Sequence, residues 1–215
     1  MAIVLAFGDS ITFGLGDLEG GWVQRLRRTI DKANLPLNSS GVWHSVLNIG
    51  VEGQTTETLL ERFEPEIKAR LWPGSEIIIL VNIGINDALF YKNRNKLWVP
   101  IEKTKENIQC LIETARKYSS NIIFIGPNPV DNTKTSPVYW DPNLSWKNED
   151  VERYNAAIKS VCDNEKILFL DIFKSFTENG YSNLLIDGIH PNDKGHKLMF
   201  KNIKEFLEKN QIIEF

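Results

Sequence analysis

The stretch Ile77-Ile78-Ile79-Leu80-Val81 is apolar at every position rather than at every second one. A strand that exposes one face to water alternates between apolar and polar residues, whereas a strand covered on both faces stays apolar throughout. This stretch therefore predicts a buried strand in a parallel sheet that has helices on both faces.

Short apolar runs with helical patterns between them extend this interpretation along the chain. The predicted strands are Ala2–Phe7, Val46–Ile49, Ile77–Ile83, Ile122–Ile125 and Ile167–Leu170. One-sided helical stripes are Trp22/Leu26/Ile30/Ala33, Leu59/Phe63/Ile67/Leu71, Ile108/Leu111/Ile112/Ala115, Val151/Tyr154/Ile158/Val161 and Met199/Ile203/Phe206/Leu207. Pro65 lies inside the second stripe, so we expect that helix to kink or split there. Alternating strands and helices predict an α/β fold, a three-layer αβα sandwich around a five-stranded parallel sheet.

The bulk composition is that of one globular domain, and we expect residues 1–215 to form a single unit. The formal net charge is −3, with 25% charged residues and no block of Lys and Arg. This balance argues against binding to nucleic acid or to an anionic membrane surface. The run Ala2–Phe7 is too short for a signal-peptide core or a membrane span, so a cytoplasmic location is expected. Cys110 and Cys162 fall in predicted helices, where reduced packing residues are favoured over a disulfide.

Residues suited to catalysis follow the first three predicted strands. Right-handed crossovers place all strand-to-helix loops along one edge of the sheet, where open α/β sheets bind ligands. Ser10 follows the first strand in Gly8-Asp9-Ser10-Ile11-Thr12, either as a nucleophile or as a helix-capping serine. Gly50 and Gly53 follow the second strand, where a backbone N–H can approach a ligand closely. Asn86 follows the third, with an N–H₂ group that can donate to an oxyanion, while Asp87 is expected to brace the loop.

The most specific signal is Asp187-Gly188-Ile189-His190, followed by Pro191 and a predicted helix from Asp193. Residues three apart in a turn can face the same side. Asp187 can therefore accept a hydrogen bond from one imidazole nitrogen of His190, which leaves the other nitrogen to accept from a serine hydroxyl. A base held by an orienting carboxylate is the arrangement that a serine nucleophile needs.

Taken together, these four blocks closely resemble the GDSL or SGNH hydrolase family over nearly the whole chain. The first block appears as Gly8-Asp9-Ser10-Ile11, with isoleucine in place of the usual leucine, and the third as Gly84-Ile85-Asn86-Asp87. The resemblance implies a flavodoxin-like SGNH fold and a Ser10–His190–Asp187 triad. It also implies an oxyanion hole formed by Ser10, Gly53 and Asn86, with Gly53 favoured over Gly50.

The resemblance implies a serine esterase that forms an acyl-enzyme on small carboxylic esters, including acyl or acetyl esters of sugars, and requires no cofactor or metal. A lysophospholipase or thioesterase with the same triad is the nearest alternative, because the same core serves many ester substrates. The motifs define neither the natural substrate nor the oligomeric state. A non-catalytic flavodoxin-like module, with Gly8–Gly14 around a phosphate, is an alternative from another class. It leaves Asn86 and the Asp187–His190 pair unused.

Rival assignments remain for several residues. Asp171, at the end of the fifth predicted strand, is a second candidate for the triad acid, although the spacing favours Asp187. His44 and His196 are expected to be structural or solvated, because neither shows metal-ligand spacing. Two long segments, Leu89–Pro100 and Asn128–Asp150, carry several aromatic residues. They form either a wall of the substrate pocket or loops packed on the domain.

Overall fold

All five predicted strands are present in the computed structural model, which describes residues 1–35 and 43–215. The strands are β1 (Ala2–Gly8), β2 (His44–Gly50), β3 (Glu76–Asn82), β6 (Asn121–Ile125) and β8 (Leu168–Leu170). They pair in parallel in the order β2-β1-β3-β6-β8. Numbered within the sheet, this order is 2-1-3-4-5, the flavodoxin-like order, in which the strand order reverses between β1 and β3. Ligands of such sheets bind beyond the carboxyl ends of the strands at this point.

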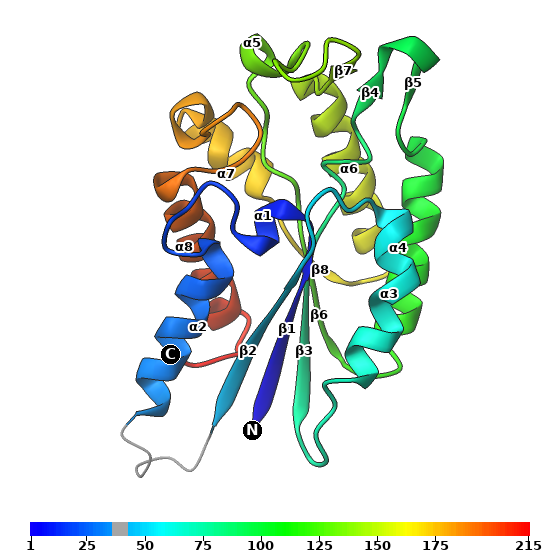
Figure 1. Cartoon of the computed structure of the whole chain (residues 1–215). Coiled ribbons are helices and arrows are strands. Elements are labelled where there is room, and N and C mark those ends of the chain that lie inside the picture. Colours follow the sequence, from blue (N-terminus) through cyan, green and yellow to red (C-terminus); the bar gives the residue numbers. More distant parts are fainter. Residues whose placement is uncertain (36–42) are drawn as a thin grey trace.

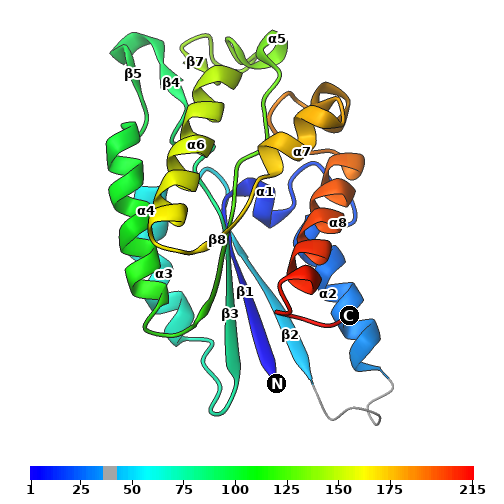
Figure 2. The same cartoon turned by 180° about the vertical axis from the view of Figure 1, so that it is seen from behind.

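Helices cover both faces of the sheet, so the predicted three-layer architecture is confirmed (Figures 1 and 2). One layer contains α2 (Gly21–Asn34), α7 (Ile172–Glu178) and α8 (Asp193–Lys209). The other contains α3 (Thr56–Lys68), α4 (Ile101–Ala115) and α6 (Asn148–Asn164). The shorter helices are α1 (Ser10–Phe13), α5 (Asn132–Thr135), η1 (Lys92–Arg94) and η2 (Tyr181–Leu184).

The interior strand β1 shows why its sequence is apolar at nearly every position. Val4 and Ala6 belong to the core cluster shared with α2 and α8, while Leu5 and Phe7 belong to the cluster shared with α3 and α4. Both sets are fully buried because successive side chains of a strand point to opposite faces. The predicted two-sided burial of the sheet is therefore confirmed.

The region around Pro65 differs from the prediction. We expected the helix to kink or split at Pro65 and its stripe to reach Leu71. The helix is not split, because α3 runs through Pro65 as one element, and it ends at Lys68. Pro65 lies in the last turn, three residues before the end of α3, and its missing N–H removes one hydrogen bond of the helix. The helix ends soon afterwards, which leaves Leu71 in the following loop with 44% of its surface exposed.

The two long aromatic segments contain secondary structure that the sequence did not reveal. We expected loops at 89–100 and 128–150, but β4 (Phe90–Tyr91), β5 (Lys96–Leu97) and β7 (Leu144–Ser145) form a small antiparallel sheet in the order β5-β4-β7. Strands of two residues are too short to produce a detectable alternation. This second sheet lies beyond the carboxyl edge of the main sheet (Figure 1).

Two sequence expectations concern membranes and cysteines. Within residues 1–35 and 43–215, no helix has both the length and the apolar character that crossing a bilayer requires. Cys110 on α4 is exposed and Cys162 on α6 is buried, and both are free thiols. The packing role that we expected for both cysteines therefore applies to Cys162 alone.

Candidate active site

Ser10 is the first residue of α1, immediately beyond the carboxyl end of β1. The side chain that caps α1 belongs to Asp9, whose Oδ1 accepts the N–H of Ile11 at 2.9 Å. The alternative in which Ser10 is the capping residue is therefore wrong. Because Asp9 supplies the cap, the Ser10 hydroxyl is available for another contact. The first N–H groups of a helix also have no acceptor within it, so the N–H of Ser10 can serve a ligand.

His190 and Asp187 extend a chain of hydrogen bonds from Ser10. Ser10 Oγ lies 2.9 Å from His190 Nε2, and His190 Nδ1 lies 2.6 Å from Asp187 Oδ2. The second carboxylate oxygen, Oδ1, accepts the backbone N–H groups of Ile189 at 2.9 Å and His190 at 2.8 Å. A carboxylate at Nδ1 favours the tautomer with its proton there. Nε2 is then an acceptor and can take the proton of the Ser10 hydroxyl.

The pKa values of two carboxyl groups at this hydrogen-bond chain, Asp187 and Asp9, are shifted in opposite directions. Burial would raise the pKa of Asp187, but the hydrogen bond and charge of His190 and two backbone N–H groups together lower it to about 2. Asp187 is therefore ionised at neutral pH and can stabilise an imidazolium. Burial dominates for Asp9 and raises its pKa to about 7, although the Ile11 N–H and the charge of His190 act against this rise.

The turn that carries His190 is held by the loop after β6. Asn128 Nδ2 donates to the carbonyl oxygen of Ile189 at 2.9 Å, and the N–H of Asp131 donates to that of Gly188 at 2.8 Å. The turn also closes on itself, because the N–H of Ile186 donates to the carbonyl oxygen of His190 at 2.9 Å. These contacts fix the backbone of His190 although no strand of the main sheet precedes it directly.

The predicted oxyanion donors other than Ser10 come from two adjacent loops. Asn86 is buried, and its Nδ2 donates one proton to the carbonyl oxygen of Gln54 at 2.9 Å, which leaves its second N–H for a ligand. Gly53, in the loop between β2 and α3, is exposed with a φ of +72°, a conformation that favours glycine. Gly50 has a different role, because a Cβ there would lie 2.2 Å from the backbone nitrogen of Phe13.

Asp87 joins these two loops beneath the site. Its buried carboxylate accepts the backbone N–H of Thr56 at 3.0 Å, together with the hydroxyls of Thr56 and Thr104. The loop-bracing role expected for Asp87 is confirmed by these contacts. Burial raises the pKa of Asp87, while its hydrogen bonds favour the ionised form.

A pocket of about 190 Å³ brings together Ser10, Gly53, Asn86 and His190, and Asp187 joins them through its contact with His190. Its lining is Ser10, Leu15, Glu52, Gly53, Asn86, Trp140, Trp146, Ile189 and His190. Trp146 also donates from Nε1 to the carbonyl oxygen of Ile85 at 2.9 Å, so it braces the backbone beside Asn86. Segment 128–150 thus contributes to the pocket wall, one of the two roles left open by its sequence. Nothing local in the sequence singled out Trp140 or Trp146 among the aromatic residues.

The rival residues lie in other surroundings. Asp171 caps α7 by accepting the N–H of Lys174 at 3.1 Å, and it also accepts from Asn155. His196 is fully buried on α8, with Nε2 3.0 Å from the carbonyl oxygen of Leu15. His44, at the start of β2, is partly buried. Among the described residues, Asp187 rather than Asp171 contacts the imidazole of His190.

Comparisons with known proteins find a matching family model, a similar curated protein and similar solved structures. The model of the GDSL-like lipase/acylhydrolase family matches residues 6–198. The isoamyl acetate-hydrolyzing esterase of Saccharomyces cerevisiae is 26% identical over 95% of this chain and 85% of its own. A lipase/acylhydrolase structure from Enterococcus faecalis superposes with a TM-score of 0.76 at 22% identity, covering 98% of this chain and 97% of that one. A variant of an acetyl xylan esterase from Geobacillus stearothermophilus gives 0.72 at 21% identity, covering 100% and 96%.

Proposed function

The chain belongs to the GDSL-like lipase/acylhydrolase family, and from this premise we propose that it is a serine esterase with Ser10 as its nucleophile. The observation that carries the proposal is the unbroken hydrogen-bond chain from Ser10 through His190 to Asp187. Each group in it has the partner that its role requires: a hydroxyl faces the free imidazole nitrogen, and the carboxylate holds the other nitrogen. Acyl transfer from small carboxylic esters is the reaction that this geometry supports best.

The first step of the proposed reaction uses the contact between the Ser10 hydroxyl and His190 Nε2. His190 Nε2 takes the proton of Ser10 as Oγ attacks the ester carbonyl carbon, and Asp187 stabilises the resulting imidazolium. The imidazolium then returns this proton to the departing alcohol oxygen as the tetrahedral intermediate collapses to an acyl-enzyme. Water, activated by the same nitrogen, hydrolyses the acyl-enzyme and regenerates the Ser10 hydroxyl.

The negative charge that develops on the former carbonyl oxygen requires hydrogen-bond donors within the same pocket. The backbone N–H groups of Ser10 and Gly53 and the side-chain amide of Asn86 are our proposed donors. Ser10, Gly53 and Asn86 all line the same pocket, and Asn86 has one N–H to spare after bonding Gln54. Donors fixed in place before reaction are effective because they need no reorganisation as the charge develops.

The size of the pocket supports a short acyl group. Its volume of about 190 Å³ lies below the range of roughly 300–1,000 Å³ that is usual for drug-sized ligands. Leu15, Trp146 and Ile189 give it apolar lining beside the catalytic groups. The names of the yeast and Geobacillus relatives also refer to acetate or acetyl esters, which supports the same proposal for this chain.

The test is hydrolysis of p-nitrophenyl esters from acetate to decanoate by wild type and Ser10→Ala. We expect activity that is highest for the shortest chains and falls by several orders of magnitude in Ser10→Ala. Ser160→Ala, at an exposed serine of α6, is the matched control and should behave as wild type. A preference for decanoate would favour the lysophospholipase or thioesterase alternative. Equal activity in wild type and Ser10→Ala would refute the proposal.

A further inference from the structure

The segment after Ser10 and the helix after His190 are packed against each other. Residues 14–20, here called the nucleophile loop, connect α1 to α2, and α8 begins three residues after His190. Gly16 closely approaches the short segment between His190 and α8, because a Cβ at this position would lie 2.5 Å from the carbonyl oxygen of Pro191. The relative placement of nucleophile and base therefore depends on this contact surface.

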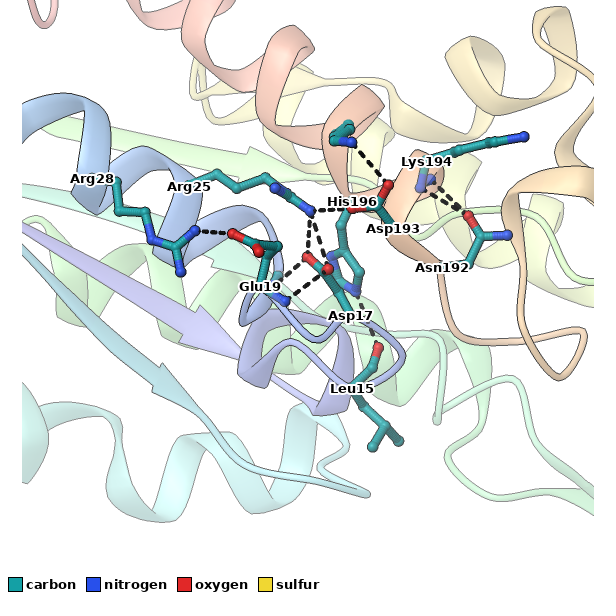
Figure 3. A network of polar contacts seen from close by, with 12 residues as sticks. Leu15, Asp17, Glu19, Arg25, Arg28, Asn192, Asp193, Lys194 and His196 are labelled. Atoms are coloured by element: carbon teal, nitrogen blue, oxygen red, sulfur yellow. Dashed lines mark hydrogen bonds and ion pairs between the residues drawn. The ribbon is translucent and has the colours of Figure 1, made fainter.

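Arg25 on α2 connects the nucleophile loop to α8 (Figure 3). Its Nη2 donates to Asp17 Oδ1 of the nucleophile loop at 3.0 Å and to Asp193 Oδ1, at the start of α8, at 2.7 Å. The side chain of Asp17 is 1% exposed and that of Arg25 is 11% exposed, while that of Asp193 is 49% exposed. An ion pair shielded from water is screened far less than a surface pair, so the inner half of this bridge is strong.

Asp17 also shapes the nucleophile loop itself. Its Oδ1 accepts the N–H of Glu19 and its Oδ2 accepts the N–H of Gly21, both at 3.0 Å. The carboxylate therefore fixes the loop backbone and the start of α2 at the same time as it holds Arg25. Removing the guanidinium would leave a nearly fully buried carboxylate without its cation.

A second connection runs parallel to the first and ends on Ser10. His196 Nε2, on α8, lies 3.0 Å from the carbonyl oxygen of Leu15, and the N–H of Leu15 donates to the carbonyl oxygen of Ser10 at 3.0 Å. Because that carbonyl is an acceptor, Nε2 carries the proton. Burial lowers the pKa of His196, which keeps the imidazole neutral. The backbone of Ser10 is thus linked to α8 through one intervening residue, Leu15.

We propose that Arg25 is a positioning residue for catalysis: by bridging Asp17 and Asp193, it holds the nucleophile loop on α8 and so maintains the Ser10–His190 contact. The inference rests on the proposed function, because it assigns a mechanical task to the same Ser10–His190 pair. Arg25 is not a lining residue of the substrate pocket, and it acts through the two backbones that carry the reacting groups. Its loss should slow the chemical step and leave substrate binding nearly unchanged.

The protein supplies a matched control in Arg28. It lies three residues further along α2 and pairs with Glu19, which belongs to the same nucleophile loop. Both side chains are about half exposed, and this ion pair joins α2 to the loop without extending to α8. Arg28→Met therefore removes the same charge from the same helix and leaves the bridge to α8 in place.

The experiment measures kcat and KM for p-nitrophenyl acetate with wild type, Arg25→Met and Arg28→Met, at a temperature where circular dichroism shows all three to be folded. We expect kcat to fall about 10- to 100-fold in Arg25→Met with KM within about threefold. Arg28→Met should keep both constants within about twofold. Arg25→Lys, which keeps the charge but loses the planar fork, should recover part of the lost kcat.

A second variant covers the case in which Arg25→Met does not fold. Asp193→Ala cuts the outer half of the bridge, at a half-exposed residue that also pairs with Lys197 on α8, and leaves the Arg25–Asp17 pair intact. It should lower kcat about 3- to 10-fold, again with KM nearly constant. Three results would each overturn the inference and leave the proposed function standing. They are a wild-type kcat in Arg25→Met, an equal loss of kcat in Arg28→Met, and an effect of Arg25→Met on KM without an effect on kcat. A wild type without esterase activity would overturn the proposed function and the inference together.

Discussion

The two sides of the pocket are built in different ways. The catalytic side consists of Ser10, Asn86 and His190, two of which follow strands of the main sheet directly. The aromatic wall consists of Trp140 and Trp146, which flank the two-residue strand β7 of the small antiparallel sheet. The sheet fixes the catalytic side through a regular register, whereas a few long-range contacts fix the wall. From this difference we infer that the main sheet holds the catalytic residues rigidly, while the aromatic wall determines which esters are accepted.

The largest effect should come from the orienting carboxylate on the catalytic side. In Asp187→Asn the amide can donate to His190 Nδ1, so the tautomer that leaves Nε2 free is no longer favoured. We expect kcat to fall by about 10⁴, the loss known for this substitution in a Ser-His-Asp triad, with KM within about threefold. Steady-state kinetics on p-nitrophenyl acetate checks this. The matched control is Asp171→Asn, and a larger loss there than in Asp187→Asn would mean that the acid has been assigned to the wrong residue.

The next effect should come from Asn86. Asn86→Ala removes one donor to the developing oxyanion, and kcat should fall by about 10²–10³. Asn86→Asp keeps the shape but replaces the donor with a negative charge, so its loss should equal or exceed that of alanine. Kinetics with both variants checks the order. A change in kcat below about tenfold in Asn86→Ala would refute the donor role and weaken the contrast between the catalytic side and the wall.

A pH effect on stability should come from Asp9, which lies next to the nucleophile. Its pKa is 3.8 in an unstructured chain and about 7 in the folded protein, so the folded state binds this proton more tightly. The contribution of Asp9 to stability is therefore favourable at low pH and is lost as pH rises from about 4 to about 7.

Asp9→Asn keeps an oxygen acceptor for Ile11 but has no charge to bury. The free energy of unfolding of wild type, relative to that of Asp9→Asn, should fall by at most about 1.4 kcal/mol per pH unit across this window. Urea unfolding at pH 4.5, 6 and 7.5 measures the difference. A difference that stays constant or grows with pH would contradict the account of a burial-raised pKa.

The smallest effect on acetate hydrolysis should come from the aromatic wall. Trp140 is 47% exposed and packs edge-on against Tyr139, with ring centroids 4.9 Å apart. Trp140→Ala should change kcat/KM for p-nitrophenyl acetate less than about fivefold, as expected for a partly exposed apolar contact. Because it enlarges the pocket, it should raise the relative rate on longer acyl chains. An unchanged chain-length profile, or a loss of acetate activity as large as that of Asn86→Ala, would remove the distinction between the two sides.

The sequence was most informative where function and fold depend on local pattern. The five apolar runs predicted the sheet because burial on both faces requires them, and the placement of Ser10 and Asn86 beyond β1 and β3 follows from topology. The pairing of Asp187 with His190 was predicted from their spacing and from the resemblance to the GDSL family, and the structure brings their side chains to 2.6 Å. The roles of these residues in catalysis remain proposals.

Other features depend on contacts between distant residues and could not be predicted. Asp9 rather than Ser10 caps α1. Both residue types are good helix caps, so the residue at which the helix begins, and not the composition, decides between them. The bond from Trp146 to Ile85 and the bridge from Arg25 to Asp193 join residues 61 and 168 positions apart. The small sheet is made of two-residue strands whose pairing, not their composition, defines them.

The central claim is that Ser10 is the nucleophile and that His190 activates it. The most direct test is to treat the protein with a fluorophosphonate, which phosphonylates an activated serine, and to locate the adduct by peptide mass spectrometry. The account predicts one adduct, on Ser10, that is absent in Ser10→Ala and forms far more slowly in His190→Ala. An adduct on another residue, or labelling that persists unchanged in Ser10→Ala, would contradict it.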